Sequence, residues 1–136
     1  MEENVTKEQF IRLLSGAPED KDCDLLLQEA LEQRWIEPQD LTDSSATLKR
    51  IDAARIIHLY IREVRKTADL PDISGAEILK DLYDCRVCVN HIAQVFLRGY
   101  MDAVSIPSGK ESTLIFDSQS PVKKSDMLAI ISNFRV

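Results

Sequence analysis

The sequence contains little glycine and proline, with 4 Gly and 5 Pro among 136 residues, and it has no long biased tract. This composition excludes collagen-like and low-complexity chains. No stretch approaches the roughly 18 consecutive apolar residues of a membrane-spanning helix. The first residues, Met1 to Glu8, lack the basic and apolar regions of a signal peptide. We therefore expect one folded domain over residues 1–136, without membrane insertion.

Basic side chains are also scarce. The 17 Lys and Arg residues against 23 Asp and Glu residues give a net charge of −6, and residues 1–47 carry 4 basic and 12 acidic side chains. Nucleic-acid binding depends on Lys and Arg contacts to phosphates. The charge therefore argues against a nucleic-acid partner.

Catalytic motifs are missing as well. The sequence has no phosphate-binding glycine loop, no nucleophile elbow and no paired-histidine metalloprotease motif. His58 and His91 are far apart in the chain, and a catalytic base needs a positioned partner. We expect packed or surface histidines, no catalytic residues, no cofactor and no enzymatic activity.

The 3 cysteines are an odd number and cannot form a closed set of disulfides. Cys85 and Cys88 have the two-residue spacing of zinc and redox motifs, with His91 three positions later and Cys23 as a conceivable fourth metal ligand. Zinc sites usually have two paired ligand sets, and redox motifs usually follow a strand. We therefore favour reduced, packed thiols over a metal or redox site, and we predict no metal ligands.

Apolar residues recur at spacings of three and four, which predicts an all-α fold. Thr6 and Asp24 are suited to begin the first two helices, and Pro121 to be the first residue of the last one, after a cap at Ser120. The longest helix is expected at 48–66, with further helical segments near 78–82 and at 89–100. The stretch 102–116 is expected to be a loop with a short extended piece at 114–116.

Three of these helix beginnings align over ten residues without gaps, starting at 5, 48 and 122. Each starts with an apolar residue, and the third position is a cation: Lys7, Arg50 or Lys124. The fifth position is an acid or an amide. Residues 31–36 also align with 95–100, so a two-helix unit is repeated.

This layout resembles the S-layer homology repeat. The most similar copy has Asp72 at its entry, residues 98–101 at the exit of its first helix, Phe116 and Asp117 in its loop, and residues 122–126 at the start of its second helix. The resemblance implies helical hairpins packed around a pseudo-threefold core. It divides the chain into a terminal half-repeat at 1–20, a repeat at 21–67 and a repeat with a longer loop at 68–136.

The resemblance also implies a function, the binding of an anionic, pyruvylated cell-wall polysaccharide that holds a protein at the bacterial surface. Lys7, Arg50 and Lys124 would contact carboxylates, Trp35 would stack on a sugar and Asp72 would accept a hydroxyl hydrogen bond. The alternative is a helical protein-interaction or assembly module that has lost glycan binding.

The odd cysteine count, the lack of a leader and the helix starts, none of which reads Thr-Arg-Ala-Glu as in the family, favour that alternative, whose partner is a protein instead of a polysaccharide. Members of the family usually come from secreted parents, so glycan binding still ranks first. The location is the cell surface if the chain comes from a secreted parent, and the cytoplasm if the chain is complete. The incomplete first repeat suggests that a second copy of the chain supplies the missing helix, which would make a homo-oligomer.

Overall fold

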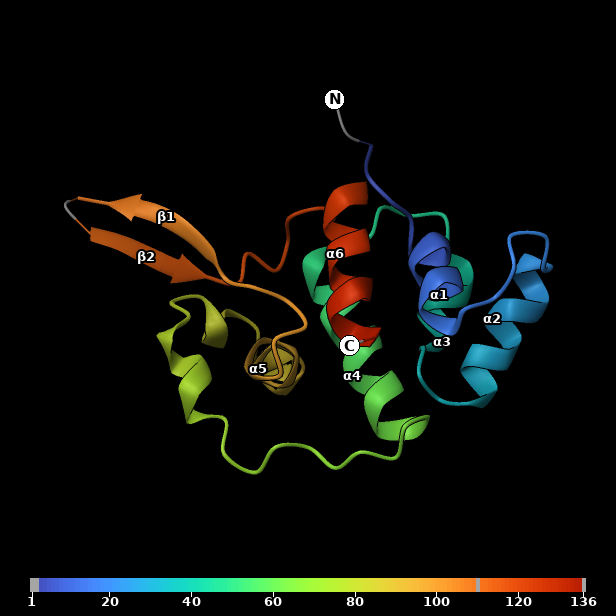
Figure 1. The fold of residues 1–136 in the computed structure, drawn as a ribbon, viewed down its shortest axis with the longest axis horizontal. Helices are drawn as coiled ribbons and strands as arrows, with labels where there is room; N and C mark the ends of the chain where they lie inside the picture. The colour runs from blue at the N-terminus through green and yellow to red at the C-terminus, as the bar shows by residue number, and fades with distance from the viewer. Residues whose placement is uncertain (1–2, 110, 136) are drawn as a thin grey trace.

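The computed structural model describes residues 3–109 and 111–135 (Figure 1). Within this part the chain forms six α-helices, three short 3-10 helices and two strands. The α-helices are α1 (Lys7–Ser15), α2 (Cys23–Glu32), α3 (Pro38–Thr42), α4 (Arg50–Glu63), α5 (Val89–Leu97) and α6 (Lys124–Arg135). The 3-10 helices are η1 (Ser74–Ile78), η2 (Leu82–Asp84) and η3 (Arg86–Cys88), and the strands are β1 (Val104–Ser108) and β2 (Glu111–Ile115).

The two strands form an antiparallel hairpin, in which Val104 is opposite Ile115 and Ser108 is opposite Glu111. The expected all-α fold is therefore wrong, and the expected loop at 102–116 is mostly sheet. Pro107 and Gly109 suggested a loop, but a hairpin of two strands consists of edge strands, where proline is tolerated. Gly109 has a φ of 66°, a value that suits the turn between the strands. The hairpin extends away from the helices in Figure 1.

The three helix beginnings that align in the sequence are joined by a closed ring of backbone hydrogen bonds. Val5 N donates to Val122 O (3.2 Å), Val122 N donates to Leu48 O (2.9 Å), and Leu48 N donates to Val5 O (2.7 Å). All three side chains are buried. The ring brings the N-termini of α1, α4 and α6 together, although they are far apart in the chain.

The last helix begins later than predicted. Helix α6 starts at Lys124, whereas Pro121 was expected to be its first residue. Pro121 instead forms an isolated β-bridge with Lys49, beside the ring. The extended backbone of this bridge is incompatible with a helix that starts at Pro121.

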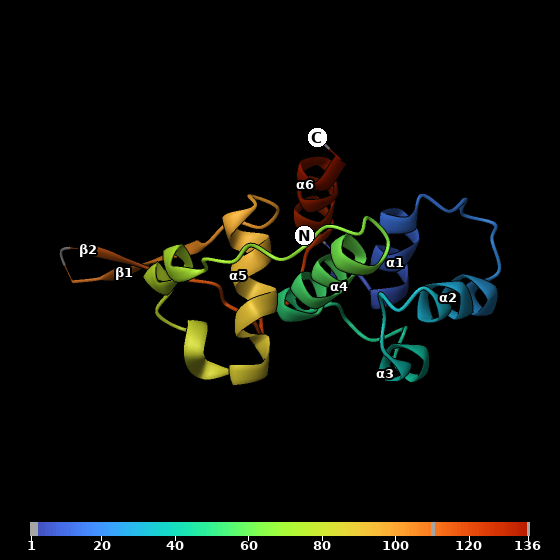
Figure 2. The same cartoon turned by 90° about the horizontal axis from the view of Figure 1, so that it is seen from below.

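An aromatic row connects the helices on one side of α4. Trp35, just after α2, meets the edge of Tyr60 on α4 at 4.9 Å between ring centroids, and Tyr60 meets Phe134 on α6 at 5.5 Å. On its other side, α4 packs against α5. Both views show α5 separated from α1 and α2 by α4 (Figures 1 and 2). The molecule therefore has two ends, one built around α1 and α2 and one around α5 and the hairpin.

None of the described helices is both long enough and apolar enough to cross a membrane.

Candidate functional site

Lys7 lies in an internal ion-pair network. Its side chain is almost fully buried, and Nζ lies 3.1 Å from Asp40 Oδ1 and 3.0 Å from Asp43 Oδ1. Burial lowers the pKa of this ammonium, but the hydrogen bonds to Asp43 and Asp40 outweigh burial and raise the pKa above its ordinary value. The predicted ligand cation is thus neutralised by carboxylates of its own chain.

Asp40 binds a second cation in the same network. Its carboxylate is fully buried and accepts two hydrogen bonds from the Arg55 guanidinium, each 2.9 Å long. Burial alone would raise the pKa of Asp40, but the bonds from Arg55, Glu37 N and Lys7 hold it below the usual value. The sequence analysis missed Asp40 and Arg55. The position of Asp40 two residues after Pro38, at the third position of a helix, was the available signal.

Arg50 is used to hold the hairpin. Its Nε donates to Phe116 O at 2.7 Å and its Nη2 donates to Asp102 O at 2.5 Å, so one guanidinium binds the chain just before β1 and just after β2. The guanidinium also lies over the Phe116 ring at 4.7 Å. Burial lowers the pKa of Arg50, with Asp117 acting in the opposite direction. Arg50 therefore holds together the two chain segments at the base of the hairpin.

Trp35 and Asp72 lie apart from these cations. The Trp35 side chain is only 1% exposed, and its Nε1 donates to Gln33. Trp35 is thus a core residue with no open face for a sugar. Asp72 is exposed and accepts a hydrogen bond from Ser74 N, which closes a local turn. The structure does not bring the five predicted ligand-binding residues together in one site.

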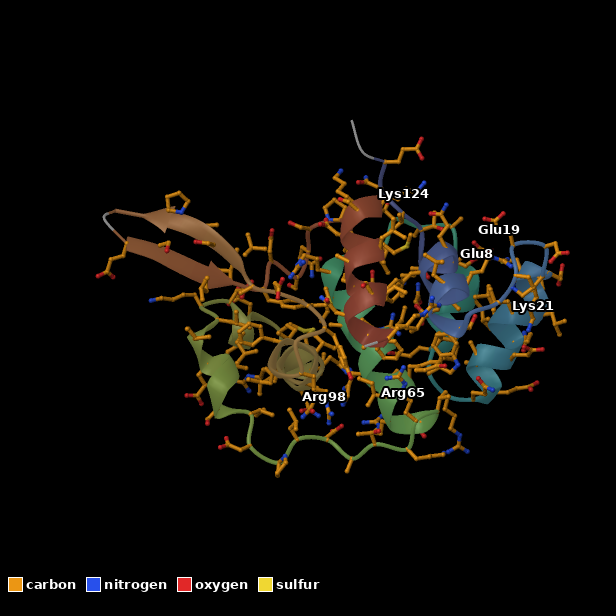
Figure 3. The ribbon with its side chains drawn as sticks, in the orientation of Figure 1. Glu8, Glu19, Lys21, Arg65, Arg98 and Lys124 are labelled. Atoms are coloured by element: carbon orange, nitrogen blue, oxygen red, sulfur yellow. A yellow bond between two sulfur atoms is a disulfide. The ribbon has the colours of Figure 1, made fainter. Side chains whose placement is uncertain are left out.

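Lys124 is the predicted cation that is exposed, in the first turn of α6. It makes no ion pair with any residue between 3 and 109 or 111 and 135. Figure 3 labels it beside α1, with Glu19 on the loop that follows α1. Lys124 lies at a groove of about 350 Å³ between α1 and α6, lined by Glu3, Asn4, Val5, Gln9, Arg12, Leu13, Ala17, Glu19, Lys124, Met127 and Leu128.

The α1/α6 groove combines apolar side chains with a charged rim. Leu13 and Met127 contribute to the apolar lining, and Leu128 on α6 is 50% exposed. Arg12 is already held, because it donates to Glu8 at 2.6 Å and to the carbonyls of Pro18 and Lys21. An amphipathic surface of this kind can bury an apolar side chain and pair charges at its edge.

His58 and His91 form a hydrogen-bonded network with a carboxylate, although the two residues are far apart in the sequence. His58 Nε2 lies 2.6 Å from Asp69 Oδ1, and His58 Nδ1 lies 2.8 Å from His91 Nδ1. The Asp69 carboxylate is an acceptor, so His58 Nε2 carries a proton and donates to it, and one of the two facing Nδ1 atoms of His58 and His91 donates to the other. Asn90 also donates to Asp69 at 2.9 Å. The network ties α4 to the start of α5.

Burial and electrostatics shift the pKa values of His91 and Asp69. Burial, with further repulsion from His58, lowers the pKa of His91 from 6.5 to about 4. The pKa of Asp69 is also lowered, because the hydrogen bonds from His58 and Asn90 outweigh the effect of burial. His91 is therefore neutral at physiological pH. The sequence held no signal for this pairing, since the residues are 33 positions apart.

Cys85 and Cys88 form a disulfide, so the expected reduced thiols at these positions are wrong. Cys23 is free, and burial raises its thiol pKa above the ordinary value. No group of three or more His, Cys, Asp or Glu side chains in the described part of the chain is placed to hold a metal ion.

No family model, no curated protein and no solved structure matches this chain.

Proposed function

We propose that the chain is a non-catalytic protein-interaction module, and that its α1/α6 groove binds an amphipathic, basic segment of a partner protein. The observation that carries this proposal is the internal neutralisation of Lys7 by Asp40 and Asp43. A surface evolved to recognise an anionic glycan needs free cations, whereas Lys7 and Arg50 both bind oxygens of this chain.

The charge of the chain favours a basic partner. The net charge is −6, and the groove is lined by two acids, Glu3 and Glu19, against the cation Lys124, since Arg12 is already bound to Glu8. Opposite charges across an interface accelerate association and select the partner. The apolar lining of the groove, with the half-exposed Leu128, then supplies the surface that is buried on binding.

Two surface leucines provide a matched test. Leu128 lies at the groove and is 50% exposed, whereas Leu25 lies on α2 outside the groove and is 52% exposed. The probe is a synthetic amphipathic helix of leucine and lysine, and its binding is measured by fluorescence anisotropy. We expect Leu128→Asp to weaken binding by about tenfold or more, and Leu25→Asp to leave binding unchanged. Equal effects of the two substitutions would contradict the proposal.

A second candidate function is the binding of an anionic cell-wall polysaccharide. It is favoured by the exposed Lys124, which lies in the first turn of α6, where the helix dipole adds positive potential. The test is sedimentation of the protein with isolated cell-wall material. Loss of sedimentation in Lys124→Gln but not in the surface control Lys80→Gln would favour the glycan. Arg50 is unsuitable for this test because its substitution releases the hairpin.

A further inference from the structure

The Cys85–Cys88 disulfide lies at the other end of the molecule from the α1/α6 groove, at the start of α5. Helix η3 runs directly into α5, so residues 86–97 form one helical segment that Cys85 precedes. Cys85 has the extended backbone of a cap residue (φ −129°, ψ 106°), and Cys88 N donates to Cys85 O across the first turn. A CxxC pair at a helix N-terminus has backbone N–H groups directed at it, which stabilise a thiolate.

The two sulfur-bearing residues are not equivalent. Cys88 packs against the hydrophobic core, whereas Cys85 is not part of that packing. Both are partly exposed, and Arg86 between them is exposed. Cys88 is therefore the sulfur-bearing residue held against the core, and Cys85 is the one that lies outside this packing.

Three large apolar side chains close to the disulfide in the sequence are exposed to solvent. Val87, within the disulfide loop, is 85% exposed, and Tyr83, two residues before Cys85, is 62% exposed. Ile78, at the end of η1 in the same segment, is 58% exposed. Large apolar side chains that remain this exposed, one of them inside the disulfide loop, indicate a contact surface for another apolar chain.

From these observations we infer that Cys85–Cys88 is a thiol–disulfide exchange site, and that its substrate is a cysteine of a polypeptide with apolar flanking residues. The activity is independent of the proposed interaction through the α1/α6 groove. It uses a separate surface on the far side of α4 (Figure 2).

The exchange takes place in two displacements. A substrate thiolate attacks Cys85 Sγ, a substrate–Cys85 disulfide forms, the Cys85–Cys88 bond breaks, and its electron pair leaves on Cys88 Sγ. A second substrate thiolate then attacks the substrate sulfur of the mixed disulfide and releases Cys85 as a thiolate. Two substrate thiols are thereby oxidised to one disulfide, the protein disulfide gains two electrons, and the two protons from the substrate thiols pass through solvent to Cys85 and Cys88.

The experiment uses the full chain with Cys23→Ser, so that only the pair can react. The probe is a reduced peptide with one cysteine between leucine residues, and the readouts are peptide disulfide and protein thiols detected by alkylation and mass spectrometry. We expect peptide disulfide and free protein thiols to appear together in the folded protein. A protein disulfide that opens only in denaturant would overturn the inference.

Trapping identifies the attacked sulfur. Each single-cysteine variant is mixed with the same peptide activated as a thionitrobenzoate disulfide. Cys88→Ser, which retains Cys85, is expected to form the mixed disulfide about tenfold faster than Cys85→Ser, which retains Cys88. Equal rates would show that the sulfurs are equivalent and contradict the assignment of Cys85.

A surface variant tests the apolar substrate without removing a cysteine. Val87→Asp is expected to slow exchange with the leucine-flanked peptide by about tenfold, and to slow exchange with reduced glutathione less, through repulsion between the new carboxylate and this anionic thiol. Leu25→Asp, at a half-exposed site on α2, is the control and is expected to change neither rate. Unchanged exchange of the peptide with Val87→Asp would rule out the apolar contact.

Discussion

Asp40 is the residue on which the charge network at the α3/α4 contact depends. It is fully buried and pairs with both Lys7 and Arg55. Without the Asp40 carboxylate, Lys7 keeps Asp43 as a partner and Arg55 keeps Glu37, but both cations lose a buried hydrogen-bond acceptor. We therefore expect Asp40→Asn to reduce the free energy of unfolding by about 1 to 3 kcal/mol in urea denaturation.

Two variants serve as comparisons for Asp40→Asn. Lys7→Met should cost less, because Asp40 retains its two hydrogen bonds from Arg55. Lys124→Met, at an exposed site, should change the free energy of unfolding by less than about 0.5 kcal/mol. A loss in Lys124→Met as large as that in Asp40→Asn would show that the network is not the cause.

His91 makes the stability of the protein depend on pH. Its pKa is about 4 in the folded protein and 6.5 in an unfolded chain, so between these values the unfolded state binds more protons. The stability contributed by neutral His91 is complete above pH 6.5 and is lost as the pH falls toward 4. We expect a loss of about 1 to 2 kcal/mol between pH 7 and pH 5, measured by urea denaturation.

The matched variant for this pH effect is His91→Gln, which cannot titrate. Its free energy of unfolding should be lower than that of the wild type at pH 7 but should change less between pH 7 and pH 5. The same pH slope in both proteins would show that another group is responsible.

At the residue scale, the contacts of the predicted cations could not be read from the sequence. It selected Lys7, Arg50 and Lys124 because they recur at the same place in three aligned segments. In the structure, Lys7 binds an oxygen of a residue 33 positions away in the chain, and Arg50 binds an oxygen of a residue 66 positions away. Such partners depend on the tertiary fold, so local spacing could not predict them.

At the scale of elements, Asp81 attaches the end of the hairpin to η2. Its Oδ1 accepts from Phe116 N at 2.7 Å and its Oδ2 accepts from Asp117 N at 2.8 Å. Asp117 has a φ of 63°, a left-handed conformation that an ordinary residue rarely adopts without support. The carboxylate thus supports the turn that leads from β2 to the ring of helix beginnings.

We expect Asp81→Ala to cost about 1 to 3 kcal/mol, because two backbone donors lose their partner. Hydrogen exchange at the amides of Phe116 and Asp117 should become faster than in the wild type. Asp84→Ala, three residues later at an exposed site, is the control and should leave both amides protected. Unchanged protection in Asp81→Ala would mean that Asp81 does not hold the end of the hairpin, and that Arg50 and the bond from Lys80 N to Leu114 O are sufficient.

The helices were largely predictable, and the hairpin was not. The spacing of Thr6 and Gln9 is that of a capping motif, which predicts the start of α1. In the structure, the Thr6 hydroxyl accepts the expected hydrogen bond from Gln9 N. The hairpin has little hydrophobic pattern, since its strands lie mostly on the surface and Ile106 is 38% exposed. Its position depends on Arg50 and Asp81, which lie elsewhere in the chain.

At the scale of the whole molecule, the ring of Val5, Leu48 and Val122 connects the two termini of the chain to its middle. Each residue donates one backbone hydrogen bond and accepts another, and each side chain is buried. The alignment of the helix beginnings was visible in the sequence, but the backbone bonds that join them were not. Because all three segments share these bonds, we expect the molecule to unfold as one cooperative unit.

The single tryptophan allows this cooperativity to be measured. Trp35 is buried against Tyr60, so its fluorescence reports on the contact between α2 and α4, while far-ultraviolet circular dichroism reports on all helices. The two urea transitions should coincide in the full chain.

Removal of residues 1–5 deletes Val5 and two bonds of the ring, and should lower the free energy of unfolding by about 3 to 5 kcal/mol by both probes. Val87→Asp, at an exposed site, should leave both transitions in place. Separate transitions in the full chain would show that the α1/α2 end and the α5 end unfold independently, and that the ring does not couple them.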